Sequence, residues 1–284
     1  RQMCIRDRIL IVILLFFMLY VPSKNRCRMT EHTVVGTVES VGFQYYKNID
    51  LYNVKFAILD SSVSKNYEFV HVYDMNNQEN DNLATSETHA DKMIEILHNL
   101  LPNLEIDLYI VADEKGIVNK ERFQWALQHI TTSRIKYDLI NMSLYVEKDR
   151  DISSLLKELY LNDTILVAAA GNMGEDEQVY PASLDFVIGV GGISELGELA
   201  NMSNYGDVEY YMPIKYRGTD ANYEGTSVSA VLFSAALLIV KHEGDFDSSE
   251  QLMEYVDTIC HNPKIDPTLG KGQVVLADIL KGSL

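Results

Sequence analysis

Four polar residues scattered along the 284-residue chain are of the types that acyl transfer by a serine hydroxyl requires. That reaction needs a nucleophile, a base to take its proton, a carboxylate to hold the base, and donors for the developing oxyanion. Ser227, His89, Asp60 and Asn172 are the candidates for these roles, in that order. Each also has an ordinary alternative: a helix-capping serine, a solvated histidine, an aspartate that closes a strand, and a Gly-Asn turn.

The segment YEGTSVSA (223–230) favours Ser227 as the nucleophile. Gly225 allows the backbone to turn tightly, and the apolar run that follows predicts a long buried helix over 227–240. A helix N-terminus presents unpaired N–H groups and the positive end of the helix dipole. A serine at this position is therefore well placed to have a developing anion stabilised beside it.

The elements that must position these residues alternate between strand and helix patterns from about residue 34 onward. The predicted strands cover 55–59, 104–111, 139–144, 164–169 and 186–190. The predicted helices cover 88–100, 119–130, 152–160 and 227–240. This alternation predicts an α/β fold, a three-layer parallel sheet with helices on both faces. Most strands are apolar throughout, whereas 104–111 alternates more and is expected nearer an edge.

Ligands of such sheets bind beyond the carboxyl ends of the strands. Asp60, Ser143 and Asn172 each lie at or just past the end of a predicted strand, and His89 lies at the start of a predicted helix. The pattern therefore predicts that these side chains converge at one edge of the sheet.

Composition narrows the function classes. The formal net charge of −17 argues against nucleic-acid binding, which needs a basic face. The three cysteines, Cys4, Cys27 and Cys260, are far apart and show no C-x-x-C spacing, so neither zinc nor a disulfide framework is expected. We predict no metal ligands and no cofactor from these residues.

The N-terminal region carries an unbroken run of 13 apolar residues, Ile9–Val21. As a helix it would span about 20 Å, short of the roughly 30 Å hydrocarbon core. A signal peptide or membrane anchor over 1–28 is the preferred interpretation, with a buried helix as the alternative. It predicts a protein outside the cytoplasm, either secreted or anchored in the membrane, with its functional domain over 29–284. If the apolar run is an artefact, a cytoplasmic location is predicted instead.

Four segments together resemble the subtilisin-like serine peptidases, the subtilase family. They are VKFAILDSSV (54–63), THADKMIEIL (88–97), ILVAAAGNMG (165–174) and YEGTSVSA (223–230). The third of these is followed at a fitting distance by VYPASLDFVIGVGG (179–192). Three weaker matches are NMSL (141–144), MSNYG (202–206) and GKGQVVLADIL (270–280). The order of aspartate, histidine and serine is also that of subtilisin.

The resemblance implies a subtilisin-like fold and a serine endopeptidase that acts on peptides or proteins. Asp60, His89 and Ser227 would form the catalytic triad, and Asn172 would complete the oxyanion hole. Six residues are expected to bind substrate: Ser143, Leu144, Tyr145, Ala169, Ala170 and Gly171. The small size suggests a dedicated task, such as maturing a peptide at the cell surface. The calcium loops of the family are not recognisable, so the sequence does not predict whether the protein depends on calcium. It does not predict the oligomeric state either.

Several positions depart from the family pattern. Asp91 puts a second carboxylate near His89, which is expected to raise the pKa of the imidazole. Tyr145 stands where the family usually has glycine and is expected to narrow the pocket for the residue before the scissile bond. Val231 replaces a usual proline. These changes leave an alternative function: a catalytically weak or inactive relative that binds peptides. A nucleotide-binding protein has little support, because no G-x-G-x-x-G motif follows a first strand.

Overall fold

The structure is a computed structural model that describes residues 36–76, 83–218, 222–262 and 267–281. The chain divides into two units, Arg1–Thr33 and Val34–Leu284. The first unit lies outside the described residues. The predicted signal or anchor over 1–28, including Ile9–Val21, therefore stays a prediction.

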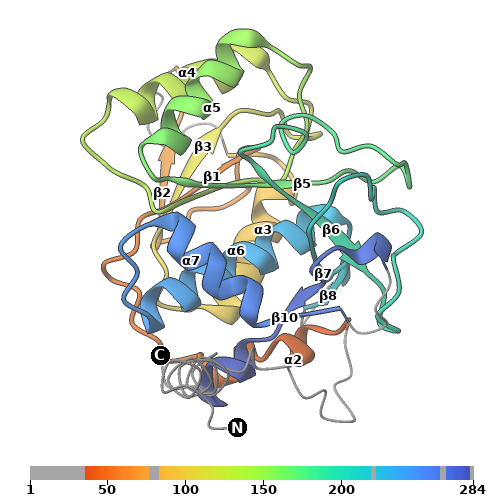
Figure 1. The fold of residues 1–284 in the computed structure, drawn as a ribbon. Helices are drawn as coiled ribbons and strands as arrows, with labels where there is room; N and C mark the ends of the chain where they lie inside the picture. Colours follow the sequence, from red (N-terminus) through yellow and green to blue (C-terminus); the bar gives the residue numbers. More distant parts are fainter. Residues whose placement is uncertain (1–35, 77–82, 219–221, 263–266, 282–284) are drawn as a thin grey trace, which may run out of the picture. The chain divides into compact units, whose positions relative to one another are not determined.

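A seven-stranded sheet forms the centre of the second unit, in the order β2-β3-β1-β4-β5-β6-β7 (Figure 1). Every neighbouring pair in it is parallel. The strands are β1 (Phe56–Asp60), β2 (Val70–Tyr73), β3 (Ile106–Ile110), β4 (Leu139–Met142), β5 (Ile165–Ala169), β6 (Ile188–Ile193) and β7 (Tyr210–Pro213). Their carboxyl ends therefore share one edge of the sheet, as the sequence pattern predicts.

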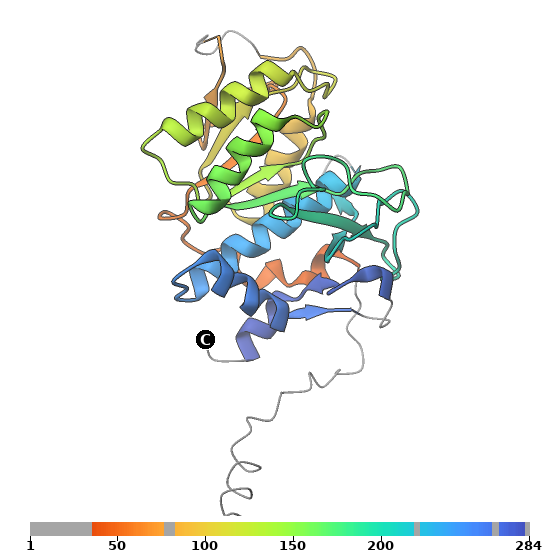
Figure 2. The same ribbon diagram turned by 45° about the horizontal axis from the view of Figure 1, so that its top comes forward.

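Helices cover both faces of the sheet (Figure 2). The helices α3 (His89–Leu100) and α6 (Thr226–Glu243) share one core cluster, and α4 (Lys120–Thr132) and α5 (Arg150–Leu161) share the other. Successive strand residues alternate between the two cores, so Phe56 and Ile58 face α3 and α6 while Ala57 and Leu59 face α4 and α5. The predicted three-layer fold is confirmed.

The helix α6 lies at the centre of its layer. All 13 residues from Val228 to Val240 are buried, and so is Thr226. Within the described part of the chain it is the one helix long and apolar enough to cross a membrane, yet 78% of that stretch is buried in the protein. Apolar side chains all around a helix are expected when protein covers every side of it, so α6 is the buried core helix that the sequence predicts.

The sequence pattern missed both edge strands of the seven-stranded sheet, β2 and β7. β3 lies second from one edge, close to the expectation for 104–111, but the edge strand β2 (VHVY) was missed. Both of its central residues, His71 and Val72, are exposed, so it lacks the apolar pattern of a covered strand. The opposite edge strand, β7, was also missed although it is buried.

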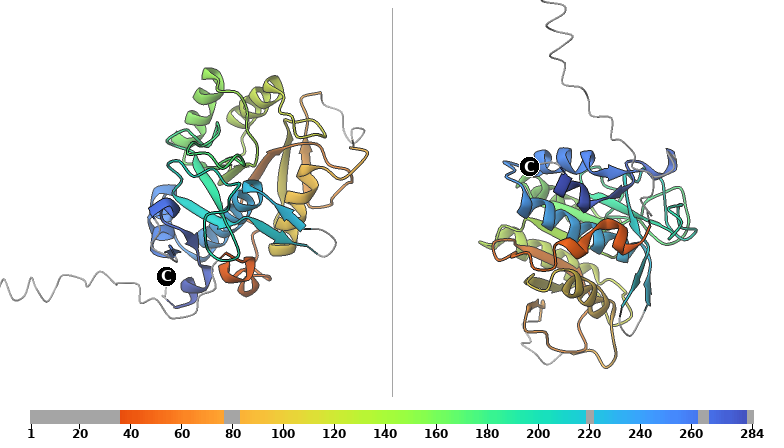
Figure 3. Two further views of the ribbon diagram at one scale, coloured as in Figure 1. Left: turned by 90° about the vertical axis from the view of Figure 1, so that its right-hand side faces the viewer. Right: turned by 90° about the horizontal axis from the view of Figure 1, so that it is seen from below.

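Smaller elements complete the second unit. They are α2 (Val38–Val41), α7 (Ser249–Thr258), the pairs β8 (Lys215–Arg217) with β9 (Asn222–Glu224) and β10 (Cys260–His261) with β11 (Gln273–Val274), and the 3₁₀ turns η1 (Phe43–Tyr45), η2 (Pro267–Leu269) and η3 (Leu276–Lys281). Segments from the two ends of the described chain lie side by side (Figure 3). The Tyr46 hydroxyl donates to the Leu276 carbonyl, and the Gly36 amide donates to Gln273.

Candidate active site

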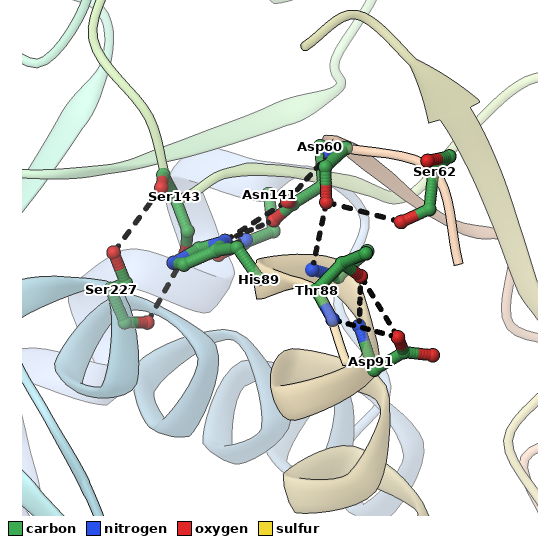
Figure 4. A network of polar contacts seen from close by, with 10 residues as sticks. Asp60, Ser62, Thr88, His89, Asp91, Asn141, Ser143 and Ser227 are labelled. Carbon is green, nitrogen blue, oxygen red and sulfur yellow. Dashed lines mark hydrogen bonds and ion pairs between the residues drawn. The ribbon is translucent and has the colours of Figure 1, made fainter. Parts of the chain in front are cut away.

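Asp60 and His89 form a close pair at the carboxyl edge of the sheet. Asp60 is the last residue of β1 and its side chain is buried, while His89 is the first residue of α3. The His89 Nδ1 lies 2.9 Å and 2.8 Å from the two Asp60 carboxylate oxygens. A carboxylate accepts hydrogen bonds only, so Nδ1 carries the proton and the neutral ring has its lone pair on Nε2. Figure 4 shows the His89 ring between Asp60 on one side and Ser227 with Ser143 on the other.

Two opposing influences act on the pKa of His89. Burial is the larger single influence and lowers the pKa, because it disfavours the charged imidazolium. The negative charge of Asp60 and the hydrogen bond to it raise the pKa, and Lys92 lowers it slightly. The balance leaves the pKa of His89 above its ordinary value, with Asp60 as the cause.

The pKa of His89 is raised as the sequence predicts, but the carboxylate that raises it is Asp60 and not Asp91. Asp91 is the capping-box residue of α3: its carboxylate accepts from the Thr88 amide at 2.9 Å and the Thr88 hydroxyl at 3.0 Å. It also accepts from the Ser64 amide at 3.0 Å and the Tyr67 hydroxyl at 2.8 Å. Burial raises the pKa of Asp91, but these hydrogen bonds lower it more. The Asp91 carboxylate therefore stabilises the start of α3 and binds the loop that contains Ser64.

Ser227 lies in the first turn of α6, next to the strand end of β4. Gly225 precedes the helix with φ +144°, in the region that favours glycine, which confirms the tight turn expected there. The Ser227 hydroxyl donates to the Ser143 carbonyl at 3.2 Å, and the Ser143 hydroxyl donates to the Ser227 carbonyl at 3.1 Å. In this structure the proton of Ser227 is thus directed at Ser143 and not at His89.

Asn172 is held by hydrogen bonds to its side-chain oxygen. Its carbonyl oxygen accepts from the Thr226 amide at 2.8 Å and the Thr226 hydroxyl at 3.0 Å. Because the backbone amide of Thr226 can only donate, the group that faces it must be Oδ1, and Nδ2 is left to donate elsewhere. The exposed Asn172 side chain lies beside Gly225, directly before the Ser227 turn. Thr226 was not singled out from the sequence, although its place beside Ser227 was the available signal.

The six predicted substrate-binding residues occupy three kinds of environment. Ser143 contacts Ser227, Leu144 packs against the α4 and α5 core, and Tyr145 is 69% exposed. The side chains of Ala169 and Ala170 lie in core clusters, and Gly171 has a positive φ of +119°. Only the backbone of these last three can therefore face a ligand. Their contact with substrate, and the narrowing of a pocket by Tyr145, stay predictions.

A cavity of about 740 Å³ lies away from this group of residues. It is lined at the amino ends of β5, β6 and β7 by residues that include Thr164, Ile188 and Tyr210, the sheet edge opposite to Asp60. The candidate site is instead the open surface around His89 and Ser227. In the described ranges no group of three or more His, Cys, Asp or Glu side chains is arranged to hold a metal ion.

The fold has three layers, with helices on both faces of a parallel sheet. A carboxylate–imidazole pair and a serine in the first turn of a helix lie at the carboxyl edge of this sheet. This arrangement is the one expected of a serine hydrolase. Comparison with known proteins narrows this class. The model of the subtilase family, peptidase family S8, matches residues 53–259. The chain belongs to the subtilase family, which confirms the resemblance found in its motifs.

Curated relatives agree with this assignment. The chain is 29% identical over 167 residues to the major intracellular serine protease of Bacillus subtilis (strain 168), covering 53% of this chain and 51% of that protein. It is 26% identical over 220 residues to the thermophilic serine proteinase of Bacillus sp. (strain AK1), covering 71% and 53%. The chain thus spans about half the length of these curated relatives.

Solved structures share the fold. A psychrophilic subtilisin-like protease, Apa1 from Pseudoalteromonas sp. AS-11, superimposes with a TM-score of 0.71 at 14% identity, covering 84% of this chain and 95% of that one. A lanthipeptide protease gives a TM-score of 0.65 at 18% identity, covering 88% and 93%. The prenylagaramide maturation protease PagA gives 0.66 at 18% identity, covering 84% and 97%. At these identities the likeness defines the fold alone.

Proposed function

We propose that this chain is a serine endopeptidase in which Asp60, His89 and Ser227 act as the catalytic triad. The observation that carries the proposal is the 2.8 Å contact of His89 Nδ1 with the buried Asp60 carboxylate. That contact leaves Nε2 as the basic atom on the side of the ring where Ser227 lies in Figure 4. Family membership and the order of the motifs support the same assignment.

In the proposed reaction, the Ser227 hydroxyl turns from the Ser143 carbonyl to His89 Nε2. Hydroxyl contacts of this kind often tighten only when substrate is bound. His89 takes the proton as Ser227 Oγ forms a bond to the substrate carbonyl carbon. The Asn172 Nδ2 and the Ser227 backbone N–H donate to the oxyanion.

His89 then passes its proton to the leaving amine, and the peptide C–N bond breaks to give an acyl-enzyme. Water then gives a proton to His89 and attacks the ester carbonyl carbon. The C–O bond to Ser227 breaks, Ser227 Oγ takes the proton back from His89, and the carboxylic acid product leaves. Every step uses groups of this chain and water, with no cofactor.

We further propose a peptide precursor as the substrate and a role in its maturation. Two proteins of the same fold support this proposal: one is named a lanthipeptide protease and the other a prenylagaramide maturation protease. The apolar run Ile9–Val21 supports a location outside the cytoplasm, secreted or anchored in the membrane.

A second candidate is a catalytically weak or inactive peptide-binding relative. The observation that favours it is the resting direction of the Ser227 hydroxyl, which donates to Ser143 and not to His89. The two candidates differ in whether His89 activates Ser227 at all.

A fluorophosphonate probe and cleavage-site profiling of a peptide library separate the candidates. The wild-type protein is expected to be labelled and to cleave, and Ser227→Ala to lose both, by about 10⁶-fold in kcat. Ser154→Ala removes a hydroxyl on the exposed side of α5 and serves as the matched control with wild-type activity. Folded wild type without labelling points to the binding protein, and a Ser227→Ala variant that cleaves like wild type contradicts the triad.

A further inference from the structure

A line of buried polar side chains runs from the middle of α6 to Ser227. The Ser234 hydroxyl donates to Asn141 Oδ1 at 3.1 Å, and Asn141 Nδ2 donates to Ser143 Oγ at 2.9 Å. Ser143 Oγ in turn donates to the Ser227 carbonyl at 3.1 Å. Ser234 and Asn141 are fully buried and Ser143 is 4% exposed. Figure 4 shows the part of this line from Asn141 to Ser227.

The direction of each hydrogen bond in the line follows from the number of protons available. A hydroxyl has one proton, and Ser143 gives its proton to Ser227, so Ser143 Oγ must accept from Asn141. Only the NH₂ of Asn141 can supply that bond, which turns its carbonyl oxygen towards α6. Ser234 is the donor that satisfies this oxygen.

The hydrogen bond from Ser234 therefore supports this orientation of the Asn141 amide from the α6 side. With the amide reversed, its oxygen would face Ser143 and compete with the Ser227 carbonyl for the Ser143 proton. The orientation set in the core is thus passed to the backbone of the first turn of α6. Ser234 lies seven residues beyond Ser227 on the same helix, about two turns or roughly 10 Å away.

We propose that Ser234 and Asn141 are positioning residues for the nucleophile. They hold the first turn of α6 against the end of β4, through Ser143, and so fix where Ser227 stands relative to His89. The inference rests on the proposed function of Ser227. Because both side chains are buried, they act on the geometry of attack and not on the binding of substrate.

The test is Ser234→Ala in the full chain. Removing the hydroxyl leaves Asn141 Oδ1 buried without its donor, which favours reversal of the amide. Misplacement of a reacting group by a distant change lowers the rate by up to about 100-fold, so kcat is expected to fall roughly 10-fold to 100-fold. KM is expected to stay within about twofold, since binding is unaltered. The pH midpoint of kcat/KM should not move, because Asp60 and His89 are untouched.

Ser229→Ala is the matched control. Ser229 is also fully buried on α6, only two residues from Ser227, and its hydroxyl donates to the Met212 and Pro213 carbonyls, both at 3.2 Å. This variant loses a buried hydrogen bond on the same helix but outside the line. It should lose thermal stability as Ser234→Ala does and keep the wild-type kcat. Ser234→Cys keeps the shape of the side chain, with a somewhat larger atom and a weak donor, and its kcat is expected between those of wild type and Ser234→Ala.

The readouts separate the two proposals. If folded wild type neither hydrolyses peptides nor reacts with a fluorophosphonate, the proposed function fails, and this inference fails with it. If wild type is active, a folded Ser234→Ala with wild-type kcat overturns the positioning role alone. An equal fall in Ser229→Ala also overturns it, because loss of any buried hydroxyl on α6 would then suffice. Should Ser234→Ala not fold, Ser234→Cys decides: wild-type kcat overturns the role, and a reduced kcat with unchanged KM supports it.

Discussion

At the scale of single residues, the chemistry of the candidate site depends on the proton of His89. Burial lowers the pKa of the imidazole, and Asp60 raises it beyond that effect. The base required by the proposed mechanism is neutral His89, with its proton on Nδ1 towards Asp60. The same carboxylate therefore orients the base and sets the pH above which the base is available.

This balance predicts the pH dependence of activity. The kcat/KM should rise with pH through a midpoint above about 6.5, the ordinary histidine value, because protonated His89 cannot accept the Ser227 proton. Asp60→Asn removes the charge that raises the pKa, so the midpoint should move to lower pH while kcat falls by about 10⁴-fold. Steady-state rates between pH 5 and 9 check both effects. A midpoint that does not move in Asp60→Asn would show that another group controls the profile.

The oxyanion role of Asn172 leads to a second prediction. Its Oδ1 is held by Thr226, so Nδ2 is the donor that Asn172→Ala removes. Loss of one oxyanion donor should lower kcat by about 10² to 10³-fold with little change in KM, because the bond forms in the transition state. Kinetics on a single peptide substrate measure this. A change confined to KM would place Asn172 in ground-state binding instead.

At the scale of elements, the start of α3 determines where His89 stands. Thr88 is the N-cap of α3 and Asp91 completes the capping box, so His89 is held in the first turn from both sides. The Asp91 carboxylate also accepts a hydrogen bond from the amide of Ser64, which follows Asp60, the last residue of β1, by four positions in the chain. The departure from the family pattern at Asp91 thus ties the two segments that carry the carboxylate and the base.

Asp91→Ala tests this tie. The change leaves the buried donor of Thr88 and the half-buried donors of Ser64 and Tyr67 without their acceptor, so the free energy of unfolding should fall by about 1–3 kcal/mol. Urea unfolding followed by circular dichroism measures the difference. Asp151→Ala removes an exposed first-turn acid of α5 and is the matched control, with a change within about 0.5 kcal/mol. Equal losses in both variants would show that Asp91 is no more than a surface helix acid.

At the scale of the whole molecule, carboxyl groups held ionised in the fold govern acid stability. Burial alone would raise the pKa of Asp91 and of Asp163. At Asp91, hydrogen bonds from Thr88, Tyr67 and Ser64 lower the pKa by more than burial raises it. At Asp163, hydrogen bonds from Ser249 and the charges of Lys136 and Lys241 do the same. Both pKa values are therefore lower in the folded than in the unfolded protein. Their contribution to stability is complete above the unfolded value of about 3.9 and is lost as the pH falls through the folded values.

The free energy of unfolding is accordingly expected to decrease as the pH drops below about 4. His89 acts in the opposite sense, because its raised pKa stabilises the fold below about 6.5 and that contribution is lost as the pH rises through the folded value. Urea midpoints from pH 2 to 8 measure the sum. A smaller acid-induced loss is expected in Asp91→Ala than in wild type. Identical acid profiles for the two proteins would contradict the role of Asp91.

Local patterns in the sequence were enough to predict the class of fold, the order of its main elements and the residues that converge at one sheet edge. Periodic apolar patterns, the Thr88–Asp91 cap and the Gly225 turn are local signals, and each produced the element it predicts. The motifs also placed the chain in its family.

The pairing of polar groups, by contrast, could be seen only in the folded protein. The edge strand β2 has no apolar pattern and exists because β3 pairs with it. The Ser227 hydroxyl has Ser143 as its acceptor, Asp91 binds Ser64 and Tyr67, and Ser234 orients Asn141 from 93 residues away. Local sequence cannot encode such pairs, because the packing of distant segments determines which buried donor finds which acceptor.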